Sequence, residues 1–204
     1  MSVKTDYDHW QGRYARPDYL FGTAPNDFLK RHAHLLKPGQ TALAIADGEG
    51  RNGVFLAEQG LDVLSVDFSP LALEKATRLA AARNVRMRIE QVDIINWDWP
   101  PEAFDVVAAI FFQFAPPPQR AKIFAGIRKT LKPGGLLLLE GYRPKQLDYK
   151  TGGPPQVENL YTRELLDEAF AGFTSLDIRE YDTEIAEGAQ HVGMSALIDV
   201  VGRK

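Results

Sequence analysis

A glycine-rich segment near residue 50 is the part of the sequence best suited to binding a ligand. It reads Gly48-Glu-Gly50-Arg-Asn-Gly53 and follows the short apolar run Thr41–Ile45. Glycines let a backbone approach a ligand closely, and a helix that begins here offers free N–H groups. Asp67 ends the next apolar run, and a carboxylate there can accept hydrogen bonds from both hydroxyls of an adenosine ribose. The pattern predicts a cofactor site at these residues; the alternative is a tight turn beside a solvated aspartate.

Two cofactor classes use this arrangement, dinucleotides and S-adenosylmethionine (SAM). A nicotinamide enzyme would be expected to carry a substrate domain or a Tyr-x-x-x-Lys pair, and none of the seven tyrosines has lysine four residues on. SAM requires a polar residue after the third strand to bind the adenine amine. Asp93 can accept from that amine, and the N–H of Ile94 can meet a ring nitrogen. SAM is therefore favoured, although an aspartate is also common in the turn that ends a strand.

Alternating strand and helix patterns position these residues. Short apolar runs followed by glycine or aspartate predict strands, and apolar positions three or four apart predict helices. Strands are expected at 41–45, 61–66, 85–92, 105–112 and 136–140, with helices at 52–59, from Pro70, and at 119–131. A long loop at 141–159 and a helix at 162–170 precede two further strands, 174–181 and 194–201, joined by 182–193. This order predicts an α/β, Rossmann-like doubly wound parallel sheet with an antiparallel C-terminal hairpin and helices on both faces.

Length and composition narrow the class of protein. The 204 residues have an ordinary globular composition and predict a single domain. The net charge of −3 argues against a nucleic-acid partner. No cysteine is present, so thiolate metal sites and a cysteine nucleophile are excluded. Neither a signal peptide nor a membrane-spanning run is found, so a cytoplasmic protein without membrane contact is expected.

Several segments together resemble the class I SAM-dependent methyltransferases. They are the stretch 43–52, Val66-Asp67-Phe68-Ser69, Gln91-Val-Asp93, Phe104-Asp105-Val-Val and Leu131-Lys-Pro-Gly-Gly135. Three further segments are similar to the tellurite-resistance-type and thiopurine-methyltransferase-like branch: the aromatic N-terminal part, 146–154, and Glu187-Gly-x-x-His191-x-Gly193. The resemblance implies that Asp47, Gly48, Gly50, Asn52, Asp67, Phe68, Asp93 and Ile94 bind SAM.

The chain departs from the family pattern at one position. The family places an acid two residues before the first glycine, where this chain has Ala46, and position 44 is also alanine. Asp47 can take part of that role, which includes holding the methionyl amine. Glu49 would add negative charge beside the same group.

Aromatic residues are expected around the reactive end of the cofactor. By resemblance, residues 1–38 form a lid or cap over a SAM-binding core at 39–141, and the lid brings Trp10 and Phe21 to the cofactor. One of the rings at 111, 112 and 114 could face the sulfonium, and Phe111 is the candidate chosen; the alternative for each ring is ordinary core packing. Residues 142–204 then form a substrate-side loop and the hairpin.

His191 is the candidate catalytic residue, placed by the sequence in a loop that would overhang the site. It could act as a general base, with a pKa that is nominally ~6.5 before environmental shifts, or be a solvated loop histidine. His32 and His34 lack the spacing of a ligand pair, so no metal is expected.

The function predicted is methyl transfer from SAM to a small-molecule acceptor, with a thiol or another chalcogen compound as the candidate. The alternatives are a SAM-binding protein with weak or no catalysis, motivated by Ala44 and Ala46, and less favourably a dinucleotide-dependent oxidoreductase. Neither a monomer nor a homodimer is favoured.

Overall fold

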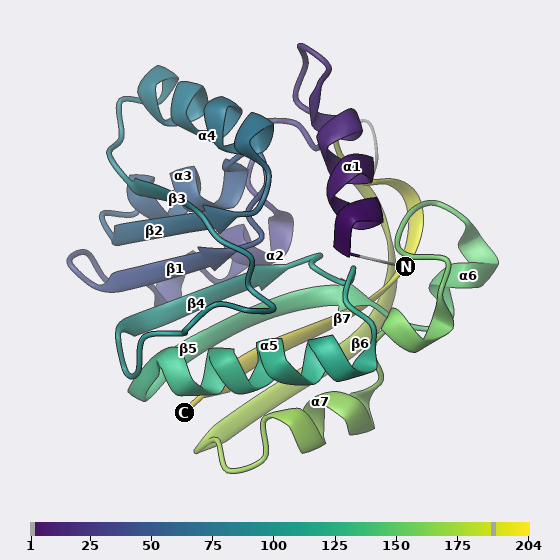
Figure 1. Cartoon of the computed structure of the whole chain (residues 1–204). Helices are drawn as coiled ribbons and strands as arrows, with labels where there is room; N and C mark the ends of the chain where they lie inside the picture. Colours follow the sequence, from purple (N-terminus) through teal and green to yellow (C-terminus); the bar gives the residue numbers. More distant parts are fainter. Residues whose placement is uncertain (1–2, 189–190) are drawn as a thin grey trace.

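The computed structural model describes residues 3–188 and 191–204, and it alternates strands with helices (Figure 1). The strands are β1 (Thr41–Ile45), β2 (Asp62–Asp67), β3 (Arg88–Gln91), β4 (Phe104–Ile110), β5 (Leu131–Tyr142), β6 (Ser175–Glu187) and β7 (His191–Arg203). The α-helices are α1 (Val3–Tyr14), α2 (Asp27–Arg31), α3 (Arg51–Glu58), α4 (Pro70–Ala82), α5 (Pro117–Thr130), α6 (Gln146–Tyr149) and α7 (Arg163–Ala169). Two short 3-10 helices are η1 (Ala33–Leu35) and η2 (Val157–Asn159).

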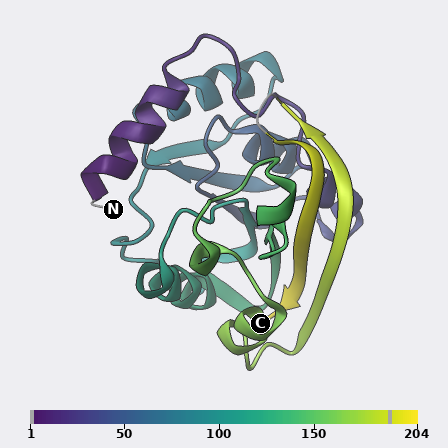
Figure 2. The same ribbon diagram turned by 90° about the vertical axis from the view of Figure 1, so that its right-hand side faces the viewer.

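All seven strands form one sheet in the order β3-β2-β1-β4-β5-β7-β6. The first five are parallel, whereas β7 runs antiparallel to both β5 and β6. The long strands β6 and β7 curve together along one side of the molecule (Figure 2). The predicted doubly wound sheet with an antiparallel C-terminal hairpin is confirmed. Its chain order reverses between β1 and β4, which is where ligands bind in open sheets of this kind.

Each face of the sheet has its own core, because successive side chains of a strand point to opposite faces. In β1, Leu43 and Ile45 pack on the side of α5 and α7, with Ile123 and Phe170. Ala42 and Ala44 pack on the side of α2 and α3. The central strands are buried on both sides, which explains why β4 and the second half of β5 are almost wholly apolar.

Local sequence signals determine where the two helices beside the glycine loop, residues 48–53, begin. Gly50 lies before α3 with φ 88° and ψ 6°, a left-handed conformation that glycine adopts without strain. Ser69 caps α4 by accepting a hydrogen bond from the N–H of Ala72 (3.2 Å), and Pro70 takes the first helical position. Both helices begin within one residue of the predicted start.

The C-terminal hairpin differs from the prediction. The expected linker 182–193 is mostly strand, because β6 continues to Glu187 and β7 already begins at His191. Residues 182–187 alternate between exposed and more buried positions, the period of a strand, despite their many charges. Strand β3 is also shorter than expected, and β5 begins earlier, at Leu131, through an irregular register. The segment 141–159, expected to be a long loop, contains α6 and η2. Within the described ranges, no helix is both long and apolar enough to cross a bilayer.

Candidate functional site

A cleft opens at the carboxyl ends of β1, β2 and β4, where the loops that follow these strands meet. It consists of two adjoining cavities of about 300 Å³ and about 730 Å³. Both are lined by Trp10, Ala46, Asp67, Phe68 and Phe114, so they form one continuous cleft. The smaller cavity lies beside β2 and the residues after β3. The larger one extends over the glycine loop toward β5 and the hairpin.

The glycine loop borders the larger cavity, and its glycines serve different purposes. Gly48 has φ 58°, and a β-carbon there would lie 2.8 Å from the Tyr14 hydroxyl. A β-carbon on Gly50 would lie 2.6 Å from that of Ala76 on α4, so this glycine permits the close packing of the loop on that helix. Gly53 likewise lets α3 approach β2, since a β-carbon there would be 2.5 Å from Asp47 Oδ2.

Asp47 is partly buried beneath the loop, and one of its oxygens is buried without a partner among the described residues. Its Oδ2 accepts hydrogen bonds from Ser65 Oγ (2.7 Å) and the N–H of Gly53 (3.0 Å). Its Oδ1 is buried and accepts no hydrogen bond among the described residues. Burial raises the pKa of Asp47 to about 7. A buried oxygen of this kind, at the edge of a cavity, is suited to a cationic ligand group.

Asp67 lines both cavities, and its side chain is buried. Its Oδ2 accepts from the N–H of Gly48 (2.9 Å) and its Oδ1 from that of Ser69 (2.9 Å), and burial raises its pKa to about 6. Each carboxylate oxygen has a second lone pair, so Asp67 can still bind hydroxyls. Asn52, the last of the expected loop residues, lines the larger cavity and accepts the N–H of Asn26 at its Oδ1 (3.0 Å).

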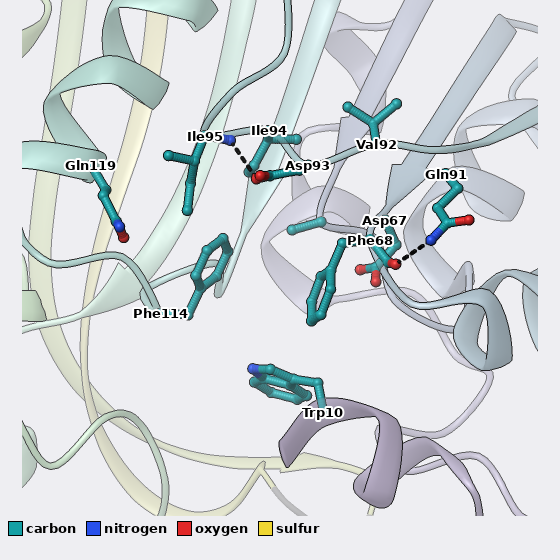
Figure 3. A pocket seen from close by; sticks show the side chains of 11 residues that line it. Trp10, Asp67, Phe68, Gln91, Val92, Asp93, Ile94, Ile95, Phe114 and Gln119 are labelled. Carbon is teal, nitrogen blue, oxygen red and sulfur yellow. Dashed lines mark hydrogen bonds between the residues drawn. The ribbon is translucent and has the colours of Figure 1, made fainter. Parts of the chain in front are cut away.

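The smaller cavity has the shape and lining of a site for a flat ring. The rings of Trp10, Phe68 and Phe114 surround it, and Asp93 and Ile94 lie at its other end (Figure 3). Asp93 accepts hydrogen bonds from the N–H of Ile95 (3.0 Å) and from Asn96 Nδ2 (2.7 Å), which fixes its carboxylate. Predicted residues from four separate segments therefore meet at one cavity.

The N-terminal segment covers the cleft through its aromatic residues. Trp10 stacks on Tyr14 at 5.6 Å between ring centroids, and the guanidinium of Arg13 lies 4.6 Å from the Trp10 ring centroid. Tyr14 and Arg13 both line the larger cavity. Tyr14 belongs to the aromatic N-terminal part noted in the sequence, but neither residue was predicted to bind the cofactor. The signal in the sequence was their spacing from Trp10. Residues three and four positions apart lie on one face of a helix, so Arg13 and Tyr14 could have been placed beside Trp10.

Contrary to the expectation from the sequence, Glu49 does not face the ligand cleft. It is buried in an ion pair with Lys75 of α4 (2.6 Å) and accepts the N–H of Leu20 (2.7 Å). Lys75 also donates to the carbonyl of Asp18 (2.8 Å). The pair therefore ties the N-terminal segment to α4 and does not contribute charge to a bound molecule.

The far end of the larger cavity is an aromatic wall around His191. The His191 ring lies 4.6 Å from Phe21 and 4.6 Å from Phe111, and 5.9 Å from Tyr142, between ring centroids. Phe111 adopts φ 50°, a conformation rare for a bulky residue, and stacks on Tyr142 at 4.7 Å. Phe112 instead packs in the core against Phe124 and Tyr161. All three neighbouring phenylalanines border the larger cavity, but Phe112 is almost fully buried in the core.

His191 is neither a loop residue nor a solvated one. It is the first residue of β7, it is 9% exposed, and its buried Nδ1 has no hydrogen-bond partner among the residues that the structure describes. Burial, and then the charges of Arg51 and Arg13, lower its pKa to about 3. The pKa of His191 is therefore well below the nominal ~6.5 of an unperturbed imidazole. The imidazole is neutral at physiological pH and is a weak base there.

Arg51 and Glu187 form a second buried ion pair at the rim of the cleft. Arg51 donates to Glu187 Oε2 at 2.6 Å, and both side chains are less than a tenth exposed. Neither residue was predicted to take part in the site. Among the described residues, no three His, Asp or Glu side chains converge as a metal site requires.

Comparison with known proteins identifies a methyltransferase domain in this chain. Residues 42–135 match the family model described as "Methyltransferase domain". "Glycine/sarcosine N-methyltransferase" of Parasynechococcus marenigrum is 33% identical over 150 residues, 65% of this chain and 52% of that protein. "Probable thiol methyltransferase 2" of Arabidopsis thaliana is 30% identical over 176 residues, 81% of this chain and 73% of that protein. This chain spans about half the length of several of the curated relatives that it matches.

A solved structure supports the fold. A SAM-dependent methyltransferase from Methanosarcina mazei superposes with a TM-score of 0.71, covering 89% of this chain and 98% of that one. The two sequences are 17% identical, so this likeness concerns the arrangement of strands and helices alone.

Proposed function

This chain belongs to the class I SAM-dependent methyltransferases, and we propose that it transfers the methyl group of SAM to a small-molecule thiol or other chalcogen compound. The observation that carries the proposal is the aromatic wall, where a neutral imidazole of low pKa stands at the end of a cofactor-sized cleft.

The residues of the cleft fit SAM. The buried Oδ1 of Asp47 suits the methionyl ammonium, and Asp67 suits the ribose hydroxyls. Asp93, Ile94, Phe68 and Trp10 line the smaller cavity, which suits the adenine. These assignments agree with those that the family resemblance implies. Asp47 thus supplies the acid that Ala44 and Ala46 lack, which supports SAM binding despite the departure from the family pattern.

SAM supplies an activated methyl group on a sulfonium, and transfer is an in-line displacement by the acceptor. What the protein adds is position and the exclusion of water. Trp10, Phe21 and Phe111 cover the reactive end of the cleft, and an aromatic face can also stabilise a cation. The proton of the acceptor must leave before or during the transfer.

The groups beside that end of the cleft favour an acceptor that ionises by itself. His191, with its pKa lowered to about 3, is a poor base near neutral pH. Burial raises the pKa of Tyr142 above its ordinary value, so its hydroxyl keeps its proton. A thiol or selenol loses its proton near physiological pH without help, whereas an alcohol does not. The relative named as a probable thiol methyltransferase is consistent with this choice.

A direct test measures radiolabelled methyl transfer from SAM to a panel of small thiols, selenols, amines and alcohols. Transfer is expected with thiols or selenols and not with alcohols. Calorimetry with SAM, and thermal shifts with SAM, its demethylated product and NAD, give binding independently of the acceptor. SAM binding without transfer to any acceptor would support the alternative, a binding protein without catalysis.

Asp67→Ala tests the cofactor assignment. Loss of a hydrogen bond to a charged group costs about 1.5–3 kcal/mol, so the Kd for SAM should rise roughly 10- to 150-fold. Asp98→Asn is a suitable control, because Asp98 is exposed and away from the cleft. Unchanged SAM binding in Asp67→Ala would contradict the assignment of this residue.

A further inference from the structure

One short segment, Leu20–Asp27, touches both the cofactor loop and the acceptor end of the cleft; we call it the strap. At its start, the N–H groups of Leu20 and Phe21 donate to Glu49 Oε2 (2.7 and 3.4 Å). Near its end, the N–H of Asn26 donates to Asn52 Oδ1 (3.0 Å). The strap is therefore hydrogen-bonded to the loop that is expected to hold SAM.

Glu187, at the end of β6, connects the strap to the same loop from the opposite side. Its Oε1 accepts from Asn26 Nδ2 (3.0 Å) and from the N–H of Asp27 (3.1 Å), while its Oε2 accepts from Arg51 (2.6 Å). Arg51 is the first residue of α3, directly after Gly50. Because both charges are buried, separating them leaves an unpaired ion in a low-dielectric site, so the two residues move together.

The aromatic wall around His191 lies on the other side of Glu187. We call it the acceptor wall, because the methyl acceptor is expected to bind there. His191 is the cross-strand partner of Glu187 in the β6–β7 register. Gly188 packs so closely on the strap that a β-carbon there would be 2.2 Å from the carbonyl carbon of Phe21. Phe21 in turn contacts the His191 ring at 4.6 Å. A displacement of the hairpin tip would thus move Phe21 and His191 together.

We propose that Glu187 is a positioning residue that couples cofactor binding to the ordering of the acceptor wall. A ligand that fixes the glycine loop fixes Arg51 and Asn52, and through Glu187 it fixes the strap and the start of β7. The acceptor site is then completed only after SAM is bound, which keeps water from the sulfonium until that point. The inference rests on the proposed use of SAM, and it does not depend on which acceptor is methylated.

Amide hydrogen exchange with and without saturating SAM tests this coupling. In the parent protein, SAM is expected to slow exchange both in the glycine loop, 48–53, and at the start of β7, 191–195, by about tenfold or more. In Glu187→Gln the protection of the glycine loop should persist, and that of 191–195 should be lost. Glu184→Gln is the matched control, because Glu184 lies on the same strand and is exposed.

Arg51→Lys carries the same test if Glu187→Gln does not fold, as judged by circular dichroism. Lysine keeps the charge but not the planar guanidinium, and Glu187 keeps its bonds to Asn26 and Asp27. Calorimetry gives the SAM affinity of each variant beside the exchange data. Full protection of 191–195 by SAM in either variant would overturn the coupling. So would a parent protein in which SAM slows exchange in the glycine loop but leaves the exchange of 191–195 unchanged. A parent that does not bind SAM would instead overturn the proposed function.

Discussion

Asp47 has the properties of a ligand-binding carboxylate held in an unfavourable state until its ligand arrives. Its Oδ1 is buried and unpaired among the described residues, and its pKa is raised to about 7. A cationic ligand group favours the ionised form and would lower this pKa on binding. Proton release and SAM binding should therefore be linked at this residue.

The linkage predicts that SAM binds more weakly in mildly acidic solution. Below the pKa of the free protein, Asp47 must lose a proton before it can pair with the ammonium, so the affinity falls by up to tenfold per pH unit. Between pH 8 and pH 6, the Kd measured by calorimetry should rise by roughly tenfold. Asp47→Asn should bind SAM more weakly and lose most of this dependence above pH 6, whereas the exposed control Asp98→Asn should behave as the parent does. A parent Kd that is constant over this range would contradict the role of Asp47.

His191 is expected to contribute shape and polarity to the acceptor wall rather than proton transfer. Because its pKa is lowered to about 3, its protonation state does not change between pH 5 and pH 9. With a thiol acceptor, His191→Asn and His191→Gln should lower kcat by less than about tenfold, and the pH profile should follow the pKa of the acceptor. A loss of 10²- to 10⁴-fold, the size typical for removal of a general base, would indicate proton transfer by His191 after all.

At the scale of elements, the glycine loop depends on its packing against α4. A side chain at Gly50 meets two obstacles: the backbone angle of φ 88° and the β-carbon of Ala76 at 2.6 Å. Gly39 has a similar angle, φ 85°, but nothing within 4 Å of a β-carbon. Comparison of the two positions separates backbone strain from collision.

Gly50→Ala is accordingly expected to lose more than Gly39→Ala in both stability and binding. The strain common to both substitutions is about 1–2 kcal/mol. In Gly50→Ala the collision adds to it and displaces the loop, so the free energy of unfolding should fall further and the Kd for SAM should rise by about tenfold or more. Gly50→Val should abolish SAM binding. Chemical denaturation and calorimetry measure these effects, and equal losses in the two alanine variants would mean that contact with α4 is unimportant.

The elements that could be predicted from sequence are those fixed by local signals. The loop from Gly48 to Gly53 was predicted from the spacing of its glycines after a strand, and the cap at Ser69 from the proline that follows it. Asp67 was placed by the end of its own strand. The hairpin was harder, because charged residues at 182–187 obscure a strand whose alternation is only partly apolar. The length of β7 likewise depends on pairing with β5 and β6, which no local pattern encodes.

Features built from distant segments could not be predicted. The contact between Asn26 and Glu187 joins residues 161 positions apart. The pKa of His191 depends on burial by rings from the strap, from the end of β4 and from β5. A sequence motif can nominate such a residue, but its environment follows only from the folded chain.

At the scale of the whole molecule, buried carboxyl groups connect the sheet to the strap. Glu140 on β5 lies opposite Asp199 on β7 in the strand register, and it accepts a hydrogen bond from Asn26 Nδ2 at 2.5 Å. Tyr181 donates to Asp199 Oδ2 at 2.9 Å. Burial, followed by the neighbouring carboxylate, raises the pKa of Glu140 well above its ordinary value, and burial also raises that of Asp199. The folded protein therefore holds protons here that the unfolded chain releases.

The contribution of this carboxyl pair to stability should consequently fall as the pH rises, and Glu140→Gln should reduce that fall. A pKa that is higher in the folded than in the unfolded state gives stability that is complete below the unfolded value, about 4.3 for glutamate, and is lost as the pH rises toward the folded value. Each such group contributes up to about 1.4 kcal/mol per pH unit in that interval.

Glutamine resembles the protonated carboxyl, so its amide can donate to Asp199 at any pH while its oxygen still accepts from Asn26. The free energy of unfolding, measured by denaturant between pH 5 and pH 8, should thus decline less steeply in Glu140→Gln than in the parent or in the exposed control Glu184→Gln. Equal slopes in all three proteins would mean that Glu140 is already ionised in the fold, and that the contact between the strap and the sheet is held by charge and not by a retained proton.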